Sequence, residues 1–246
     1  NRQDCLGVHG IARDLAAAGM GELKKTEIPK IKTNGASPIN VLFEEKTDER
    51  NYCPTFGSSY IKNVKNCESP QWLKDKLNSI GLKPISALVD VTNYILFDFN
   101  RPLHVYDANK VSGNIIIRSA KKDEKFLGLD DKEYTLEKGM CVIADEKKPL
   151  GLGGILGGSS SACDMATTNV LLESALFIPS NIANTGRKLF IDSDARYRFE
   201  RGVDPDSLNV GLDRAASLIQ EICGGEISER QICGTVIKSE QDISFD

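Results

Sequence analysis

The sequence predicts a mixed α/β (α+β) fold, in which a multi-stranded sheet with flanking helices follows a short helical segment. Short apolar segments with strand character outnumber the long helical segments, and the two kinds do not strictly alternate along the chain. The 246 residues are 40% hydrophobic and 27% charged, which is typical of a globular protein. A chain of this length forms one large domain, or a medium domain with a small appendage.

The N-terminal segment predicts a helix over residues 5–18. Asp4 is a suitable N-cap, apolar residues recur at helical spacing, and Gly19 ends the pattern. No methionine precedes this helix, so we expect the chain to be part of a longer one. The polar residues 24–40 have little to bury and indicate a domain boundary.

Two helices are expected after an apolar start at residues 41–43 and a stretch of short strands and loops up to residue 66. Ser69 followed by Pro70 indicates a helix start, because the hydroxyl caps the first turn and proline lacks only an N–H that would have no partner there. Gly81 ends this helix. Apolar spacings of three and four residues predict a second helix over residues 87–99, although a buried strand has a similar pattern.

The second half of the chain predicts strands followed by helices. The candidate strands, which are rich in β-branched and aliphatic residues, cover residues 115–118, 125–129, 133–136, 141–144 and 170–174. Helices are expected to begin near Pro179, Asp194 and Asp204. Gly224 ends the last of them.

Charge and cysteine content disfavour several classes of protein. The 31 Lys and Arg against 35 Asp and Glu give a net charge of −4, so bulk charge does not favour nucleic-acid binding, although a local basic patch could. The 7 cysteines form no C-x-x-C pair, which indicates reduced thiols rather than a zinc knuckle or a disulfide framework. We find neither a signal peptide nor an apolar run near the ~18 residues that span a bilayer. We therefore expect a cytoplasmic protein without a membrane partner.

Residues 150–158 are rich in glycine but match no phosphate-binding motif. The third glycine of the dinucleotide fingerprint is missing, and no Gly-Lys-Ser/Thr sequence is present. Glycine in such a segment permits close approach of the backbone, either to another strand or to a small ligand.

Three further features are candidates for chemistry. Glu173 stands inside an apolar strand, where it either points to solvent or is a buried acceptor that awaits a donor. His104 has a structural role or an acid–base role; Asp107 could fix its tautomer, but no nucleophile is tied to it by spacing. Arg196 and Arg198 lie in the densest basic patch, whose aromatic residues suit nucleic acid and whose acidic residues suit a salt-bridged helix face.

Six separated motifs, taken together and in order, resemble the beta subunit of bacterial phenylalanyl-tRNA synthetase. They are NRQDCL from Asn1, VDVTNY from Val89, PLH from Pro102, GGILGG from Gly153, VLLE from Val170 and YRFERGVDP from Tyr197. The resemblance covers nearly the whole chain. It implies that residues 1–38 are the end of a small N-terminal domain with its connector, 39–240 a tRNA-editing domain, and 241–246 the start of the next linker.

The resemblance implies hydrolytic proofreading of tRNA(Phe) that carries tyrosine by mistake. A pocket built for phenylalanine rejects an analogue with one added hydroxyl by only ~10²-fold, so a second site is needed. By resemblance, the catalytic residues are His104, Thr92 and Asn93; the substrate-binding residues are Glu173, which reads the phenol, and Gly157, Gly154, Ser193, Ala195 and Lys83; the tRNA-contacting residues are Arg196 and Arg198.

The resemblance also implies that water attacks the ester and that the protein supplies positioning, without a metal or cofactor in this part. The full-length enzyme would use ATP and magnesium, and its partners would be tRNA(Phe) and the alpha subunit in a heterotetramer. The chain departs from the usual pattern at Lys83, at Asn100-Arg101 and at Ser193. The alternative is a non-catalytic module that contacts tRNA or is structural and whose pocket has decayed; a glycine-rich nucleotide-binding enzyme is disfavoured by motif spacing.

Overall fold

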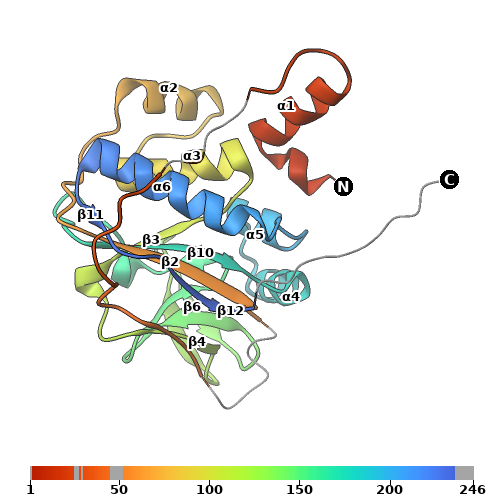
Figure 1. Cartoon of the computed structure of the whole chain (residues 1–246). Coiled ribbons are helices and arrows are strands. Elements are labelled where there is room, and N and C mark those ends of the chain that lie inside the picture. Colours follow the sequence, from red (N-terminus) through yellow and green to blue (C-terminus); the bar gives the residue numbers. More distant parts are fainter. Residues whose placement is uncertain (1, 25–27, 29, 45–51, 236–246) are drawn as a thin grey trace.

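Two β-sheets pack face to face, and helices cover the outer face of one sheet (Figure 1). The computed structural model describes residues 2–24, 28, 30–44 and 52–235. In that part of the chain, no helix is both long enough and apolar enough to cross a membrane. The model and the comparisons with known proteins below agree with the predicted mixed fold class.

The first sheet is built around β10 (Val170–Leu176), in which every residue is buried. β10 pairs antiparallel with β2 (Thr55–Lys62) on one side and with β3 (His104–Asp107) on the other. Two short strands, β11 (Glu226–Ile227) and β12 (Gln231–Gly234), pair with β2. A strand buried along its whole length needs cover on both faces, and the second sheet and the helices provide it.

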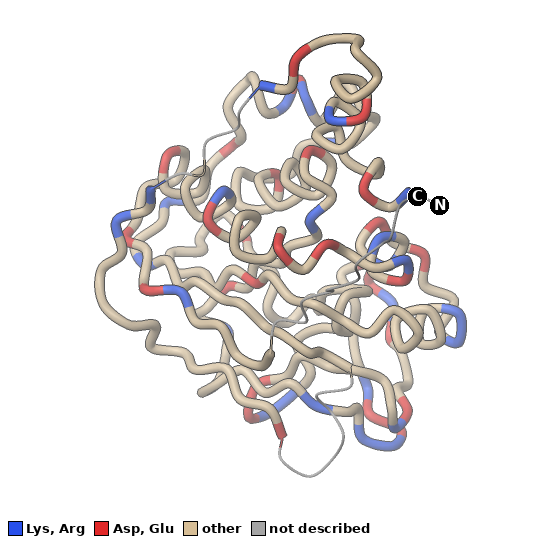
Figure 2. Tube along the Cα trace, turned by 45° about the vertical axis from the view of Figure 1, so that its right-hand side comes forward, with Lys and Arg blue, Asp and Glu red and all other residues tan. Residues whose placement is uncertain are grey.

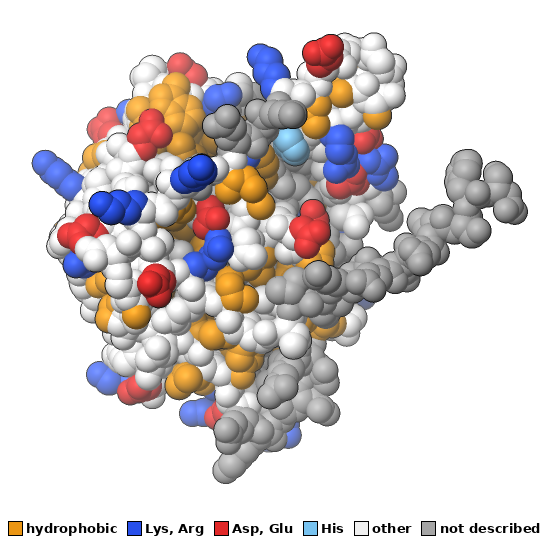
Figure 3. All heavy atoms as spheres, in the orientation of Figure 1, with side chains coloured by type: hydrophobic (Ala, Val, Ile, Leu, Met, Phe, Trp, Pro, Cys, Tyr) orange, Lys and Arg blue, Asp and Glu red, His pale blue; other side chains and the backbone are white. Residues whose placement is uncertain are grey.

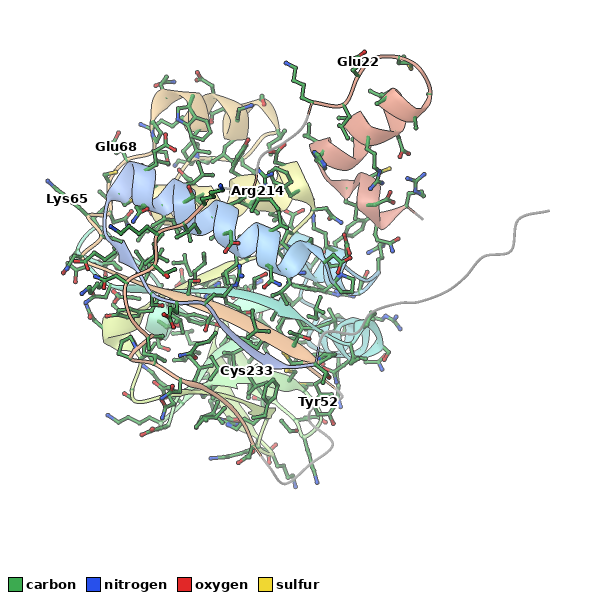
Figure 4. All side chains as sticks on the ribbon, in the orientation of Figure 1. Glu22, Tyr52, Lys65, Glu68, Arg214 and Cys233 are labelled. Carbon is green, nitrogen blue, oxygen red and sulfur yellow. The ribbon has the colours of Figure 1, made fainter. Side chains whose placement is uncertain are left out.

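The second sheet has the strand order β1-β4-β7-β8-β9. Its strands are β1 (Val41–Phe43), β4 (Ile115–Ser119), β7 (Cys141–Ala144), β8 (Pro149–Leu152) and β9 (Leu156–Gly157). β1 and β4 are parallel, and the other neighbours are antiparallel. β5 (Glu124–Leu127) and β6 (Glu133–Leu136) form a separate hairpin. Cys233 of β12 donates its thiol hydrogen to the carbonyl oxygen of Val41, which links the two sheets at one edge (Figure 4).

Helices cover the first sheet on the face away from the second sheet (Figure 1). They are α2 (Gln71–Ser79), α3 (Ala87–Phe99) and α6 (Ser207–Cys223), while α4 (Pro179–Leu189) and α5 (Asp194–Phe199) follow β10 at its carboxyl end. The other helical elements of the described residues are the short helices η1 (Gln3–Leu6), η3 (Ala108–Lys110) and η4 (Ser159–Ser161) and the N-terminal α1 (Val8–Ala17). Arg214 of α6 stacks on Phe99 of α3 at 4.3 Å, so the two helices are also joined by a cation–π contact (Figure 4).

The alternation of side chains along β10 divides the interior into two cores. Leu171 and Ala175 pack between the sheets, whereas Val170 and Leu172 pack against the helices. Glu173 has the parity of Leu171 and Ala175. The alternation therefore places its carboxylate between the two sheets.

Local patterns predicted many elements well. The helix over Ala87–Phe99 and the strands Glu133–Leu136 and Cys141–Ala144 are confirmed with the predicted bounds. In α2, Leu73 and Leu77 are buried, whereas Trp72 and, at the end of the helix, Ile80 are exposed. Figure 3 shows an apolar patch over this helix.

Three helix starts differ from the prediction. Asp4 does not cap an N-terminal helix, because its carboxylate is bound by Arg2 and Arg13; a 3₁₀ turn precedes Gly7, after which α1 begins. Ser69 does not cap α2, because its hydroxyl donates to Asp90 at 2.6 Å. The last helix begins at Ser207 rather than near Asp204, after a turn.

The predicted domain limits stay predictions. Residues 30–40 run beside the main body, where Asn34 N donates to the carbonyl oxygen of Ile227 at 2.8 Å. The predicted linker 241–246 lies outside the described residues. All seven cysteines are free thiols, as predicted.

Candidate active site

A cavity with a volume of ≈ 70 Å³ opens between the two sheets and α5. A single water needs roughly 10–15 Å³, so several fit. The lining residues come from β3 and the two residues before it, β7, the glycine-rich hairpin β8–β9, β10 and α5: Pro102, Leu103, His104, Tyr106, Ile143, Gly151, Leu152, Gly153, Gly154, Ile155, Leu156, Gly157, Glu173, Ala195 and Phe199.

Glu173 is the carboxylate of this cavity, and it is 7% exposed. In the sheet it stands directly opposite His104 of β3 and Ser58 of β2, so the three side chains share one face. The phenolic hydroxyl of Tyr106 donates a hydrogen bond to Glu173 Oε2. The alternative that Glu173 is a buried acceptor is therefore confirmed, and its donor within the chain is Tyr106.

Burial raises the pKa of Glu173 to about 7, against the hydrogen bond from Tyr106 and the positive charge of Arg101, which lower it. Near neutral pH the carboxyl group therefore exchanges between its ionised and neutral forms. Perturbed titration in a cavity is typical of functional sites.

Arg101 is a fully buried cation on the helix side of β10. Its Nε donates to Ser174 Oγ at 3.0 Å, and a terminal nitrogen donates to the carbonyl oxygen of Ala175. Burial lowers its pKa to about 10, against the negative charge of Glu173, so the guanidinium remains protonated at neutral pH. A Cβ atom at Gly211 would lie 2.6 Å from Arg101 Cγ, so glycine in α6 makes room for this side chain.

Sequence reasoning noticed Arg101 only as a departure from a family pattern. No local rule assigned it a site role, because its partners lie about 70 and 100 residues further along the chain. The signal that could have found it is a charged residue between Asn100 and Pro102, directly after an apolar helix.

His104 lies in the cavity as a neutral imidazole. Burial lowers its pKa to about 4, and its Nε2 atom is buried without a hydrogen-bond partner among the described residues. Its ring packs edge-on against Tyr106 with centroids 4.4 Å apart. Asp107 does not fix its tautomer, because residues three apart on a strand point to opposite faces; the Asp107 carboxylate instead accepts from Thr167 Oγ1 at 2.8 Å.

The glycines of the hairpin allow side chains to approach the backbone closely. A Cβ at Gly157 would lie 3.0 Å from His104 Nε2 and closer still to the adjacent ring carbon. Gly154 has φ +69, and a Cβ there would lie 2.7 Å from the Phe177 ring. These glycines therefore make room for an imidazole and an aromatic ring at the cavity wall.

α5 forms the opposite wall of the cavity. Ser193 Oγ donates to the carbonyl oxygen of Ile155 at 2.6 Å and accepts from Arg196 N, so it caps α5 and ties it to the hairpin. Ala195, in the first turn of α5, lines the cavity. The structure thus brings together His104, Glu173, Gly154, Gly157 and Ala195, whereas Ser193 does not line the cavity and donates only to the backbone of the lining residue Ile155.

Thr92, Asn93 and Lys83 do not line this cavity. Thr92 and Asn93 lie on α3, which packs on the other face of the first sheet, and the Thr92 hydroxyl donates to the carbonyl oxygen of Val89. Lys83 lies in the segment between α2 and α3. The structure therefore separates these three residues from Glu173 and His104.

Within the basic patch on α5, Arg198 faces inward and Arg196 is partly buried. Arg198 is 4% exposed; its guanidinium binds Asp194 and the carbonyl oxygen of Leu6 and stacks on the Phe97 ring at 4.6 Å. This corrects the expectation of a surface contact for Arg198, because a tRNA cannot reach a buried guanidinium. Arg196 pairs with Glu200 at 3.1 Å. Basic and acidic residues are interspersed around the chain (Figure 2).

One group of potential metal ligands comes together in the described part of the chain, and it lies outside the cavity. It consists of Asp4, Cys5 and Asp14. Arg2 and Arg13 pair with these carboxylates, so their charge is already balanced.

Comparisons with known proteins give one consistent family. The sequence-family model of the B3/4 domain matches residues 52–224. Phenylalanine–tRNA ligase beta subunits are similar along the chain: that of Rhodopseudomonas palustris is 51% identical over 245 residues, and that of Paramagnetospirillum magneticum is 54% identical over 235 residues. These matches cover 100% and 96% of this chain but only 30% and 29% of the relatives.

A solved structure has the same fold. An N-terminal fragment of the phenylalanyl-tRNA synthetase beta subunit from Pyrococcus horikoshii matches with a TM-score of 0.54, over 93% of this chain and 60% of that chain. At 16% identity, this likeness concerns the fold alone.

Proposed function

This chain belongs to the B3/4 domain family, and from that membership we propose that it is the proofreading module of a phenylalanine–tRNA ligase beta subunit. It hydrolyses the ester that joins tyrosine to tRNA(Phe), within an enzyme that attaches phenylalanine to the same tRNA. The observation that carries this proposal is the buried carboxylate of Glu173 in the cavity.

Glu173 distinguishes tyrosine from phenylalanine by a hydrogen bond. The phenol of tyrosine donates to the carboxylate, whereas phenylalanine would cover the carboxylate and offer no donor. A buried acceptor left without a partner costs about 1–3 kcal/mol, more when it is charged, which corresponds to roughly 10- to 100-fold in rate. That margin supplies the discrimination between tyrosine and phenylalanine that the pocket for the ligase reaction lacks.

His104 orients the water that attacks the ester. Its Nε2 is buried beside Gly157 without a hydrogen-bond partner among the described residues, and a water admitted together with the substrate would satisfy it by one hydrogen bond. The water oxygen attacks the ester carbonyl carbon, the bond to the ribose oxygen breaks, and the proton of the water ends on that oxygen. With a pKa of about 4, His104 is a weak base and contributes by positioning. Thr92, Asn93 and Lys83 are left out of this site.

The family membership extends the proposal to the complete protein. It contains tRNA(Phe)-binding parts and pairs with an alpha subunit, uses ATP and magnesium for the ligase reaction, and works in the cytoplasm. Within this chain, residues 39–240 form the editing domain, and 1–38 belong to the end of the preceding small domain.

Deacylation of Tyr-tRNA(Phe) and Phe-tRNA(Phe) tests the proposal. The chain should hydrolyse the tyrosyl ester faster, and Glu173→Gln should reduce that preference by at least about tenfold. Glu68→Gln is the matched control, because Glu68 is an exposed glutamate outside the cavity (Figure 4). Equal rates above background for the unaltered chain and Glu173→Gln would refute the assignment of Glu173. Rates at background level for both would favour the non-catalytic alternative.

A further inference from the structure

The carboxylate that reads the substrate already holds a phenol of the chain itself. Tyr106 is 1% exposed, its ring packs on His104, and its hydroxyl donates to Glu173 Oε2. This is the same chemical contact that a bound tyrosine would make. Within the chain itself, a tyrosine hydroxyl therefore already donates to the carboxylate that is proposed to bind the hydroxyl of the substrate.

One oxygen of Glu173 remains for a ligand. Tyr106 is the side-chain hydrogen-bond partner of Glu173, and among the described residues no hydrogen bond reaches Glu173 Oε1. Ser58, directly opposite on β2, has a buried hydroxyl that finds no partner in the described part of the chain, so it does not occupy this oxygen. The carboxylate of this cavity-lining residue thus has one oxygen held from β3 and one without a donor among the described residues.

We propose that Tyr106 is a positioning residue for specificity, whose hydroxyl holds one oxygen of Glu173 and leaves the other to accept the phenol of the substrate. This inference rests on the proposed proofreading function. A carboxylate held through one oxygen cannot rotate away from the ligand, so its second oxygen is presented in a constant direction. Such pre-organisation is what makes a polar group in a cavity selective.

The surroundings of Glu173 support the role of this hydrogen bond. Tyr106 and His104 from β3 share the face of the sheet on which Glu173 lies, the Cys53 thiol interacts with Glu173 electrostatically, and the Arg101 charge acts on it from the helix side of the sheet. Burial lowers the pKa of His104 to about 4, so His104 carries no charge near neutral pH, and burial raises the pKa of the Cys53 thiol. The Tyr106 hydroxyl and the Arg101 charge are then the groups that favour the ionised carboxylate.

The test is Tyr106→Phe, which removes the oxygen and keeps the ring that packs on His104. The carboxyl carbon of Glu173 is followed by ¹³C NMR against pH in the 246-residue chain, and Glu173→Gln assigns the signal. We expect the titration midpoint in Tyr106→Phe to rise by about one pH unit, because a donor to the ionised form is lost. Tyr134→Phe is the matched control, since the Tyr134 hydroxyl donates to Asp130 at 2.7 Å outside the cavity.

Free tyrosine and phenylalanine are then titrated into the same variants. The preference for tyrosine should fall about tenfold in Tyr106→Phe near pH 7 and recover in part at higher pH, where Glu173 is ionised again. A loss of fold alone would not produce such recovery. An unchanged Glu173 midpoint in Tyr106→Phe would overturn the role of Tyr106. Absence of any tyrosine preference in the unaltered chain would instead refute the proposed function, so the two failures are distinguishable.

Discussion

Replacing Glu173 by glutamine should change how stability depends on pH. In the folded chain, burial raises the pKa of Glu173 from 4.5 to about 7, so between these values the folded state holds a proton that the unfolded state has released. The free energy of unfolding contributed by Glu173 therefore falls as pH rises through this window. At about 1.4 kcal/mol per pH unit, the full change is about 3 kcal/mol.

His104 has the opposite effect. Burial lowers its pKa from 6.5 to about 4, so in that window the unfolded state holds the extra proton and stability rises with pH. The magnitude is again about 3 kcal/mol. Between pH 4.5 and 6.5 the two contributions nearly cancel in the unaltered chain. Each becomes visible only when the other is removed.

Urea unfolding of the unaltered chain, Glu173→Gln and His104→Gln at intervals from pH 4 to 8 measures both contributions. Relative to the unaltered chain, Glu173→Gln should become more stable by about 3 kcal/mol as pH rises from 4.5 to 7. His104→Gln should become less stable by a similar amount from pH 4 to 6.5. The reasoning would be refuted if the difference between Glu173→Gln and the unaltered chain did not vary with pH.

Three other predictions concern single residues. Phe190 caps α4 with φ 55 and is 93% exposed, so Phe190→Gly should stabilise the chain by about 0.5–1 kcal/mol in urea unfolding, and a loss of stability would contradict this. Gly157→Ala should slow tyrosyl ester hydrolysis by roughly 10²-fold, because the new methyl group displaces His104; unchanged rates would show that the imidazole position is unimportant. Arg198→Ala should lower the free energy of unfolding by about 2 kcal/mol, because it removes the hydrogen bonds of a buried guanidinium to Asp194 and Leu6. The midpoint of denaturant unfolding measures this loss, and an unaltered midpoint would contradict the inward-facing arrangement of Arg198.

Regular local patterns made part of the fold predictable. The spacing of apolar residues identified Ala87–Phe99 as a helix, and aliphatic runs identified β7 and β10, because these patterns depend on neighbours only. β3 and β8 were not predicted as strands. One is four residues of mixed character and the other contains glycine, so their pairing depends on partners far along the chain.

The candidate site, too, was predictable from the sequence only in part. Glu173 was noticed because a carboxylate inside an apolar strand violates a local rule. Tyr106 and Arg101 were not noticed as its neighbours, because Tyr106 is 67 positions away in sequence and no periodicity relates them. Both alternatives for Arg198, a nucleic-acid surface and a salt-bridged helix face, placed it on the surface, and its burial was missed because a helix sequence does not reveal which of its faces is covered.

The sequence by itself determined the family, through separated motifs in a constant order, and it determined the main helices and strands through local periodicity. Only the tertiary structure decided that Glu173 faces the space between the sheets and that Tyr106 supplies its hydrogen bond. The physical reason is strand register. A shift of one residue between β10 and β3 would turn the carboxylate to the other face, and register is set by packing and pairing across the whole fold.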